Sequence, residues 1–183
     1  MVRAVEQVRK KLVLATGALR AQGVEYALVG GNAVAAWVAT VDEGAVRNTQ
    51  DVNIMIRRED LGRMRAALES AGMVYRHAAG LDFFLESPEA SPRQGVHVVF
   101  AGELVRPHEP ASNPDLSDVV EIGGVRVIGL AGLVSIKLTA FRDKDRTHLR
   151  DMIDVGLVDR AWVARLPAEL AARLTLLLDT PGG

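Results

Sequence analysis

Residues 26–56 read YALVGGNAVAAWVATVDEGAVRNTQDVNIMI, and this stretch decides the fold. An apolar run ends at Gly30-Gly31, a helical segment follows from about Asn32, and a polar loop leads into a second apolar run that starts at Asp51. Glycine suits such a break because it adopts positive φ at little steric cost. The pattern predicts a strand, a glycine turn, a helix, a loop and a second strand.

The second strand begins with two polar side chains, Asp51 and Asn53. Side chains two apart on a strand point to the same side of a sheet, so we expect them to lie together. The glycine turn leads into a helix N-terminus, where free N–H groups and the helix dipole favour an anion. Phosphate at the turn and a cation at Asp51 indicate a site for a nucleoside triphosphate and Mg²⁺. Taken alone, the turn is better explained as a tight connection, since it completes neither a Rossmann fingerprint nor a P-loop.

The polar residues before the second strand extend the pattern to Gly-Gly, helix, and then Arg47-x-Thr49-x-Asp51. This arrangement resembles the nucleotidyltransferase superfamily, and within it the small bacterial branch that includes AbiEii-type toxins and lincosamide nucleotidyltransferases. Asn53 stands where that family has its second aspartate. Residues 136–151 also resemble the helical part of such proteins, so the likeness covers most of the chain.

The resemblance implies transfer of a nucleotidyl group from a nucleoside triphosphate to a hydroxyl acceptor, such as a tRNA end, a protein side chain or an antibiotic. In that reaction paired carboxylates hold Mg²⁺ ions about 4 Å apart, which clamp the attacking and leaving oxygens. The resemblance assigns metal binding to Asp51 and Asn53. It assigns nucleotide binding and support of the site to Gly30, Gly31, Asn32, Arg47 and Thr49. Because an amide brings no negative charge, we expect Mg²⁺ to bind weakly and transfer to be slow or absent.

A second hypothesis is a binding module that keeps the fold without the chemistry, as a nucleotide sensor or the non-catalytic partner of a toxin–antitoxin-type pair. The number of carboxylates separates the two hypotheses. Only Asp51 is secure, with Asn53 and His97 where two more would stand. We expect His97 to be a hydrogen-bonded core residue, because a lone histidine in an apolar strand more often packs than binds a ligand. The sequence identifies neither the acceptor nor a homo-oligomer or protein partner.

Composition sets wide limits on the class of protein. The chain has 183 residues, of which 49% are hydrophobic, a formal charge of −1 and no cysteine. This length and apolar content suit one domain, or a core with a small helical appendage. The lack of cysteine excludes disulfides, thiolate metal sites and cysteine nucleophiles. Without a signal peptide or an apolar run of membrane-spanning length, a cytoplasmic protein is expected.

Strand and helix patterns mix over the first two thirds of the chain, and helical patterns follow to the end. We therefore expect an α/β nucleotidyltransferase-like core over residues 1–128, with a mixed sheet flanked by helices. A C-terminal helical segment over residues 129–183 would pack on this core. Gly123-Gly124, between two apolar runs, predicts a two-residue hairpin. Residues 101–117 form the longest segment without periodicity, and we expect it to be functional or mobile.

Lys137 falls in the middle of the apolar stripe of a helix predicted from about Leu130. A lysine on a buried face is unusual unless it is paired or reaches a cleft. Either its stem packs and its amine extends to water, or the amine reaches phosphate or Asp51. The resemblance favours the second and adds Lys137 to Asp51 and Asn53 as a catalytic residue. The charged residues that follow, with Arg150 and Asp154 one helical turn apart, are expected to form a solvated ion-paired face.

Overall fold

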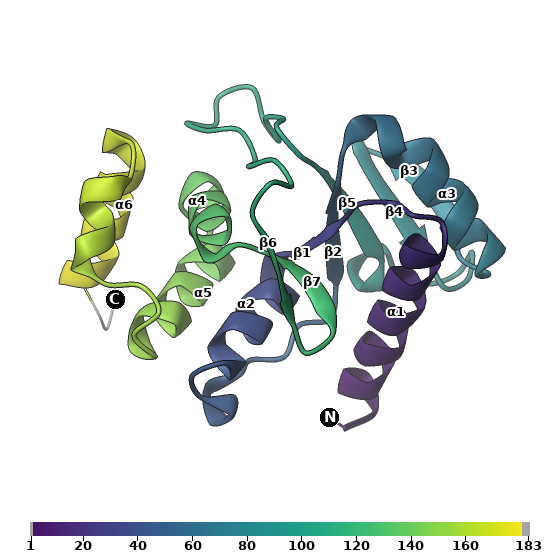
Figure 1. Ribbon diagram of the computed structural model, residues 1–183, viewed down its shortest axis with the longest axis horizontal. Coiled ribbons are helices and arrows are strands. Elements are labelled where there is room, and N and C mark those ends of the chain that lie inside the picture. The colour runs from purple at the N-terminus through teal and green to yellow at the C-terminus, as the bar shows by residue number, and fades with distance from the viewer. Residues whose placement is uncertain (1, 181–183) are drawn as a thin grey trace.

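The computed structural model describes residues 2–180, with side chains from residue 6 onward (Figure 1). Its strands form one seven-stranded sheet: β1 (Ala27–Val29), β2 (Val52–Ile56), β3 (Val74–Ala78), β4 (Leu81–Leu85), β5 (Val96–Phe100), β6 (Val119–Ile122) and β7 (Val125–Ile128). Its α-helices are α1 (Val2–Ala21), α2 (Gly30–Ala39), α3 (Leu61–Ser70), α4 (Leu130–Ala140), α5 (Asp143–Asp154) and α6 (Ala168–Asp179). Short 3₁₀ turns are η1 (Glu43–Ala45), η2 (Arg58–Asp60), η3 (Pro92–Gln94) and η4 (Arg160–Arg165).

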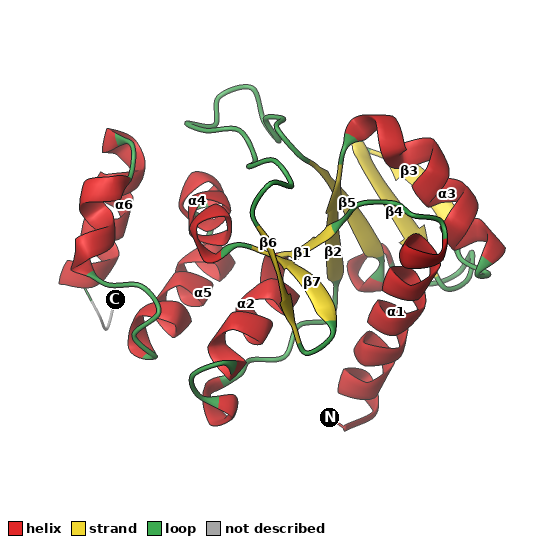
Figure 2. Cartoon of the chain, in the orientation of Figure 1, coloured by secondary structure: helices red, strands yellow, loops and turns green. Residues whose placement is uncertain are grey.

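The sheet is mixed, with the order β3-β4-β5-β2-β1-β7-β6 (Figure 2). At its centre β1 runs antiparallel to β2 and parallel to β7, while β2 runs parallel to β5. The outer strands pair as antiparallel neighbours, which short turns can connect. The predicted α/β class, a mixed sheet flanked by helices, is confirmed.

Glycine turns connect both outer pairs of strands, and the one at Gly123-Gly124 is the hairpin that the sequence predicts. Gly123 and Gly124 join β6 to β7 with φ of 58° and 77°. Positive φ at both central residues matches the twist of paired strands, and glycine adopts it at little cost. Gly80, with φ of 75°, lies in the turn between β3 and β4.

Helix α1 places its apolar residues at helical spacing, with Ala15 and Leu19 fully buried. It ends at Ala21. Gly23, just beyond this end, has a φ of 61°, and the Val24 N–H donates to the Leu19 carbonyl at 3.0 Å. This geometry satisfies carbonyl groups that the helix end would otherwise leave unpaired. Helix α1 packs against α3 and β2, and α3 packs against β3.

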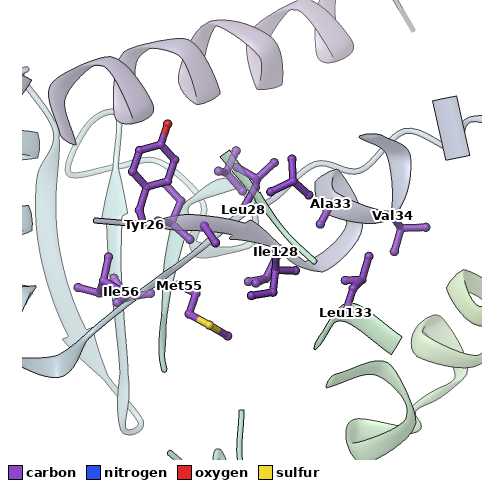
Figure 3. Close-up of a cluster of buried hydrophobic side chains, with 14 of the residues drawn as sticks. Tyr26, Leu28, Ala33, Val34, Met55, Ile56, Ile128 and Leu133 are labelled. Carbon is purple, nitrogen blue, oxygen red and sulfur yellow. The ribbon is translucent and has the colours of Figure 1, made fainter. Parts of the chain in front are cut away.

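The hydrophobic core lies around β1 and β2, where the two strands meet α2 and α4 (Figure 3). Leu28, Met55 and Ile128 are at most 2% exposed. Burying each such side chain contributes about 1.5–3 kcal/mol. The core therefore holds the turn between β1 and α2 in place from both sides.

All described elements after Ile128 are helices, and they gather on the left of the view in Figure 1. Both α4 and α5 pack against α2, and α6 packs against α4 and α5. The segment between β5 and β6 contains no helix or strand and arches over the top of the view. Within the described residues, no helix is both long and apolar enough to cross a membrane.

Candidate functional site

A cavity of about 560 Å³ opens between the β1–α2 turn, the ends of the central strands and the helical segment. This volume lies in the range of small-molecule sites, about 300–1,000 Å³. Its wall includes several residues that the sequence singles out together with charged residues of the α4–α5 region: Gly30, Gly31, Asp51, Asn53, His97, Lys137, Arg142, Lys144 and Asp145. The fold thus brings segments of both the sheet and the helices to one cavity.

The glycine turn approaches two polar side chains more closely than any other residue type would allow. Gly30 has φ of 70°, and a Cβ added there would lie 2.7 Å from Asn53 Nδ2. A Cβ at Gly31 would lie 2.9 Å from Thr49 Oγ1. Helix α2 begins at Gly30, two residues before the predicted start at Asn32, so both glycines lie in its first turn. Its N-terminal N–H groups receive no side-chain cap.

Asp51 lies immediately before β2 and accepts hydrogen bonds on both carboxylate oxygens. Oδ1 accepts from Thr49 Oγ1 at 2.5 Å and from Lys144 Nζ at 3.1 Å, and Oδ2 accepts from Asn53 Nδ2 at 2.9 Å. Burial raises the pKa of Asp51, but the hydrogen bonds from Thr49 and Asn53 and the charge of Lys144 outweigh it. The pKa therefore lies well below its usual range, and Asp51 is a firm carboxylate at neutral pH.

Asn53 and His97 stand side by side on β2 and β5. They are paired in register, so their side chains share a face of the sheet. The Asn53 amide donates to Asp51, and His97 Nε2 lies 2.9 Å from the Pro92 carbonyl. A carbonyl only accepts, so His97 donates through Nε2. The expected hydrogen bond of His97 is present, but the ring is half-buried and lies on the cavity wall.

Lys137 is buried at 4% exposure, and its amine donates to Asp145 Oδ1 at 2.9 Å. Asp145 also accepts from Arg142 Nε at 2.8 Å. Burial lowers the pKa of Lys137, against the opposing charge of Asp145. Burial raises the pKa of Asp145, but Lys137 and Arg142 outweigh it and the net shift is downward. Lys137 thus lies on the cavity wall with Asp145 as its partner, and its amine does not extend to water.

The prediction that the charged residues of α5 form a solvated ion-paired face is only partly right. Asp143 and Arg146 do form an exposed pair at 3.6 Å, but other charged residues of the helix are buried or pair elsewhere. Asp145 and Asp151 are 1% and 8% exposed, and each has a partner on another element or at the helix start. Arg150 donates to the Thr180 carbonyl at 3.3 Å instead of pairing with Asp154. The reason is that α5 packs against α2, α4 and α6, which buries Asp145 and Asp151, while Asp143, Lys144 and Asp154 stay exposed.

Two predicted site residues, Asn32 and Arg47, do not line the cavity. Asn32 Nδ2 donates to the Asp51 backbone carbonyl at 2.7 Å, and Arg47 Nε donates to Asp151 at 2.8 Å. Thr49 acts through its hydrogen bond to Asp51. The predicted residues that line the cavity are therefore Gly30, Gly31, Asp51, Asn53 and Lys137, and Asn32, Arg47 and Thr49 do not line it. The roles of all of them in binding or catalysis stay predictions.

Lys144 is the site residue that the sequence alone does not reveal. It lies seven residues after Lys137, but α4 ends at Ala140 and a second helix begins at Asp143. Phe141 between them has φ of 47°, which redirects the chain. Helical periodicity therefore does not carry across this break. Without the tertiary structure, Lys144 is one charged residue among many.

The donor set of the cavity does not fit a protein-held pair of Mg²⁺ ions. Among the described residues, no group of three or more His, Cys, Asp or Glu side chains is placed to hold a metal ion. Near the glycine turn there is one carboxylate at Asp51, and the neighbouring side chains are an amide at Asn53 and an imidazole at His97. Mg²⁺ favours carboxylate oxygens, and a two-metal site needs several of them.

The fold is similar to that of several proteins of known structure. The antibiotic-resistance factor ANT(2'')-Ia gives a TM-score of 0.59 at 13% identity, covering 94% of this chain and 91% of that one. A protein from H. pylori, assigned as a nucleotidyltransferase, gives 0.55 at 15% identity over 97% and 77% of the two chains. An antigenic nucleotidyltransferase-like protein from Paracoccidioides brasiliensis gives 0.53 at 15% identity over 94% and 87%. Neither a family model nor a curated protein sequence matches the chain.

Over nearly its whole length the chain therefore shares its fold with these nucleotidyltransferase structures. The resemblance inferred from the sequence is confirmed at this level. The assignment of the chain to the branch of AbiEii-type toxins and lincosamide nucleotidyltransferases stays a prediction.

Proposed function

We propose that this protein binds a nucleoside triphosphate in the cavity and belongs functionally to the nucleotidyl-transfer lineage. The observation that carries the proposal is the closeness of the uncapped Gly30-Gly31 turn to Asn53, whose amide donates to Asp51 at the same cavity wall. Free N–H groups at a helix start favour phosphate. The cationic side chains of Arg142 and Lys144 line the same cavity, where they can contact phosphate oxygens.

In such a transfer, an acceptor hydroxyl attacks the α-phosphorus, a new P–O bond forms and the bond to pyrophosphate breaks. The hydroxyl proton must pass to a base, and general bases work best with a pKa near the operating pH. Asp51 is a poor base because its pKa is far below neutrality. Together with the uncharged Asn53, this supports slow transfer, with the acceptor drawn from the hydroxyl compounds named above.

A second candidate is a binding module without transfer activity, such as a nucleotide sensor or one partner of a toxin–antitoxin-type pair. Two contacts favour it: Asn53 and Lys144 both donate to Asp51, so the single carboxylate is held by protein groups. Both candidates share nucleotide binding and differ only in turnover.

The binding proposal can be tested by titrating isotope-labelled protein with ATP, GTP, CTP or UTP and following backbone amide signals by NMR. The Gly30 and Gly31 amides should shift on binding, while those of Gly123 and Gly124, in the β6–β7 turn outside the cavity wall, should not. A nucleoside without phosphate should have little effect. If a nucleotide binds and the Gly30 and Gly31 amide signals do not shift, the binding site lies elsewhere and the proposal is refuted.

Turnover separates the two candidates. Pyrophosphate release is measured with Mg²⁺, nucleoside triphosphates and a set of hydroxyl acceptors, for the natural chain and for Asn53→Asp. The variant restores a second carboxylate without changing side-chain size. A gain in metal-dependent release supports the transferase lineage. If the natural chain binds nucleotide and neither protein releases pyrophosphate, the binding module is the better description.

A further inference from the structure

The Asp51 carboxylate receives positive charge from a lysine on another part of the fold. Lys144 Nζ, at the start of α5, lies 3.1 Å from Asp51 Oδ1. Thr49 donates to the same oxygen, and Asn53 donates to the other. Each oxygen that could face a cation therefore already has a protein donor, and one of these donors is itself a cation.

The charged side chains around this pair balance in number. Five basic side chains and five carboxylates line the cavity: Arg58, Arg106, Lys137, Arg142 and Lys144, and Asp51, Asp82, Glu103, Glu109 and Asp145. In a site that relies on metal ions, several carboxylates create a negative field that the metal must offset before a polyphosphate can approach. Here the carboxylate beside the glycine turn, Asp51, already has positive charge next to it in the Lys144 ammonium group.

The Lys144 side chain can also contact a ligand in the cavity while it stays paired with Asp51. Its side chain is 55% exposed, and its ammonium group has three donors on a flexible stem. One donor can remain on Asp51 while another meets a phosphate oxygen. Arg142 has a side chain that is 62% exposed and lines the same cavity, so it offers further donors nearby.

We propose that Lys144 takes the electrostatic role of a protein-held divalent cation, so that this site binds the triphosphate in its metal-free form. This inference rests on the proposed nucleotide binding. It concerns the binding step and assigns Lys144 as a phosphate-binding residue. Asp51 then positions Lys144 at the cavity wall.

The test measures ATP binding by isothermal titration calorimetry, once with EDTA and once with excess Mg²⁺. Two variants accompany the natural chain. Lys144→Met removes the ammonium from an exposed side chain and keeps most of the stem. Lys10→Met is the matched control: its side chain is 75% exposed on α1, outside the cavity. Thermal unfolding of both variants confirms that they are folded.

We expect the natural chain to bind ATP with EDTA about as tightly as with Mg²⁺. Lys144→Met should weaken binding in EDTA at least about tenfold, which equals about 1.4 kcal/mol. Lys10→Met should change it less than about twofold. Mg²⁺ should restore part of the affinity that Lys144→Met loses. Without the lysine ammonium, the Asp51 carboxylate can hold the Mg²⁺ that accompanies ATP.

Each other outcome has a distinct meaning. If the natural chain binds ATP only with Mg²⁺, the lysine inference is wrong and nucleotide binding stands. If Lys144→Met binds as tightly as the natural chain in EDTA, Lys144 is not the phosphate contact. If ATP, GTP, CTP and UTP all fail to bind under either condition, the proposed function itself fails.

Discussion

Lys137→Met probes the buried ion pair at the cavity wall. The amine of Lys137 lies 2.9 Å from Asp145, and the two side chains are 5% and 1% exposed. Methionine fills most of the space of the lysine stem, so the substitution removes charge and leaves little cavity. Asp145 then keeps only Arg142 as a cationic partner, at 2.8 Å.

The expected loss of stability follows from this geometry. Removing one partner of a buried ion pair costs about 3–5 kcal/mol, because the other charge stays buried without compensation. Arg142 retains part of that compensation, so we expect a loss of about 2–3 kcal/mol. For a chain of this length each kcal/mol lowers the melting temperature by about 2–4 °C, so the shift should be roughly 5–10 °C.

The assay is urea denaturation followed by circular dichroism, together with thermal unfolding. Lys10→Met, whose amine is exposed and pairs with Glu6 at 3.5 Å, should stay within about 0.5 kcal/mol of the natural chain. The double variant Lys137→Met with Asp145→Asn should recover part of the loss, since the unpaired charge is gone. If Lys137→Met is as stable as the natural chain and instead weakens triphosphate binding, the amine serves the ligand and this reasoning is refuted.

Two further predictions concern the glycine turn and a buried histidine. Gly30→Ala should cost about 2–3 kcal/mol, from positive φ and the contact with Asn53. Gly123→Ala, with positive φ but open space around it, should cost only about 1 kcal/mol in the same denaturation assay. Burial, helped by two nearby lysines, lowers the pKa of His148 from 6.5 to about 4. The unfolded chain therefore takes up a proton at higher pH, and stability should fall by at most about 3 kcal/mol as pH decreases from about 6.5 to 4. His148→Gln should lose this pH dependence; an unchanged profile would contradict it.

The sequence by itself determines the local units of this protein. The β1–α2–β2 unit follows from an apolar run, a glycine turn and a second apolar run, all within 31 residues of chain. The alternation of side chains on a strand predicts that Asp51 and Asn53 share a face, and their hydrogen bond shows that they do. Gly123-Gly124 likewise predicts its hairpin. These features are readable because periodicity and backbone preference act between residues close in sequence.

The composition of the cavity wall depends on contacts between distant segments. Lys144 and Asp51, which both line the cavity, are 93 residues apart in the sequence. The pairing of Asn53 with His97 depends on how β2 and β5 come into register.

Only the tertiary structure decided which cations meet Asp51 and which are used inside the fold. Lys137 and Lys144 are both lysines of the helical segment, yet one is buried against Asp145 and the other reaches Asp51. The break at Phe141 and the packing of α5 against α2 set that difference. The helix break and the helix packing depend on how the side chains of the whole chain pack together. No single local pattern in the sequence predicts that packing.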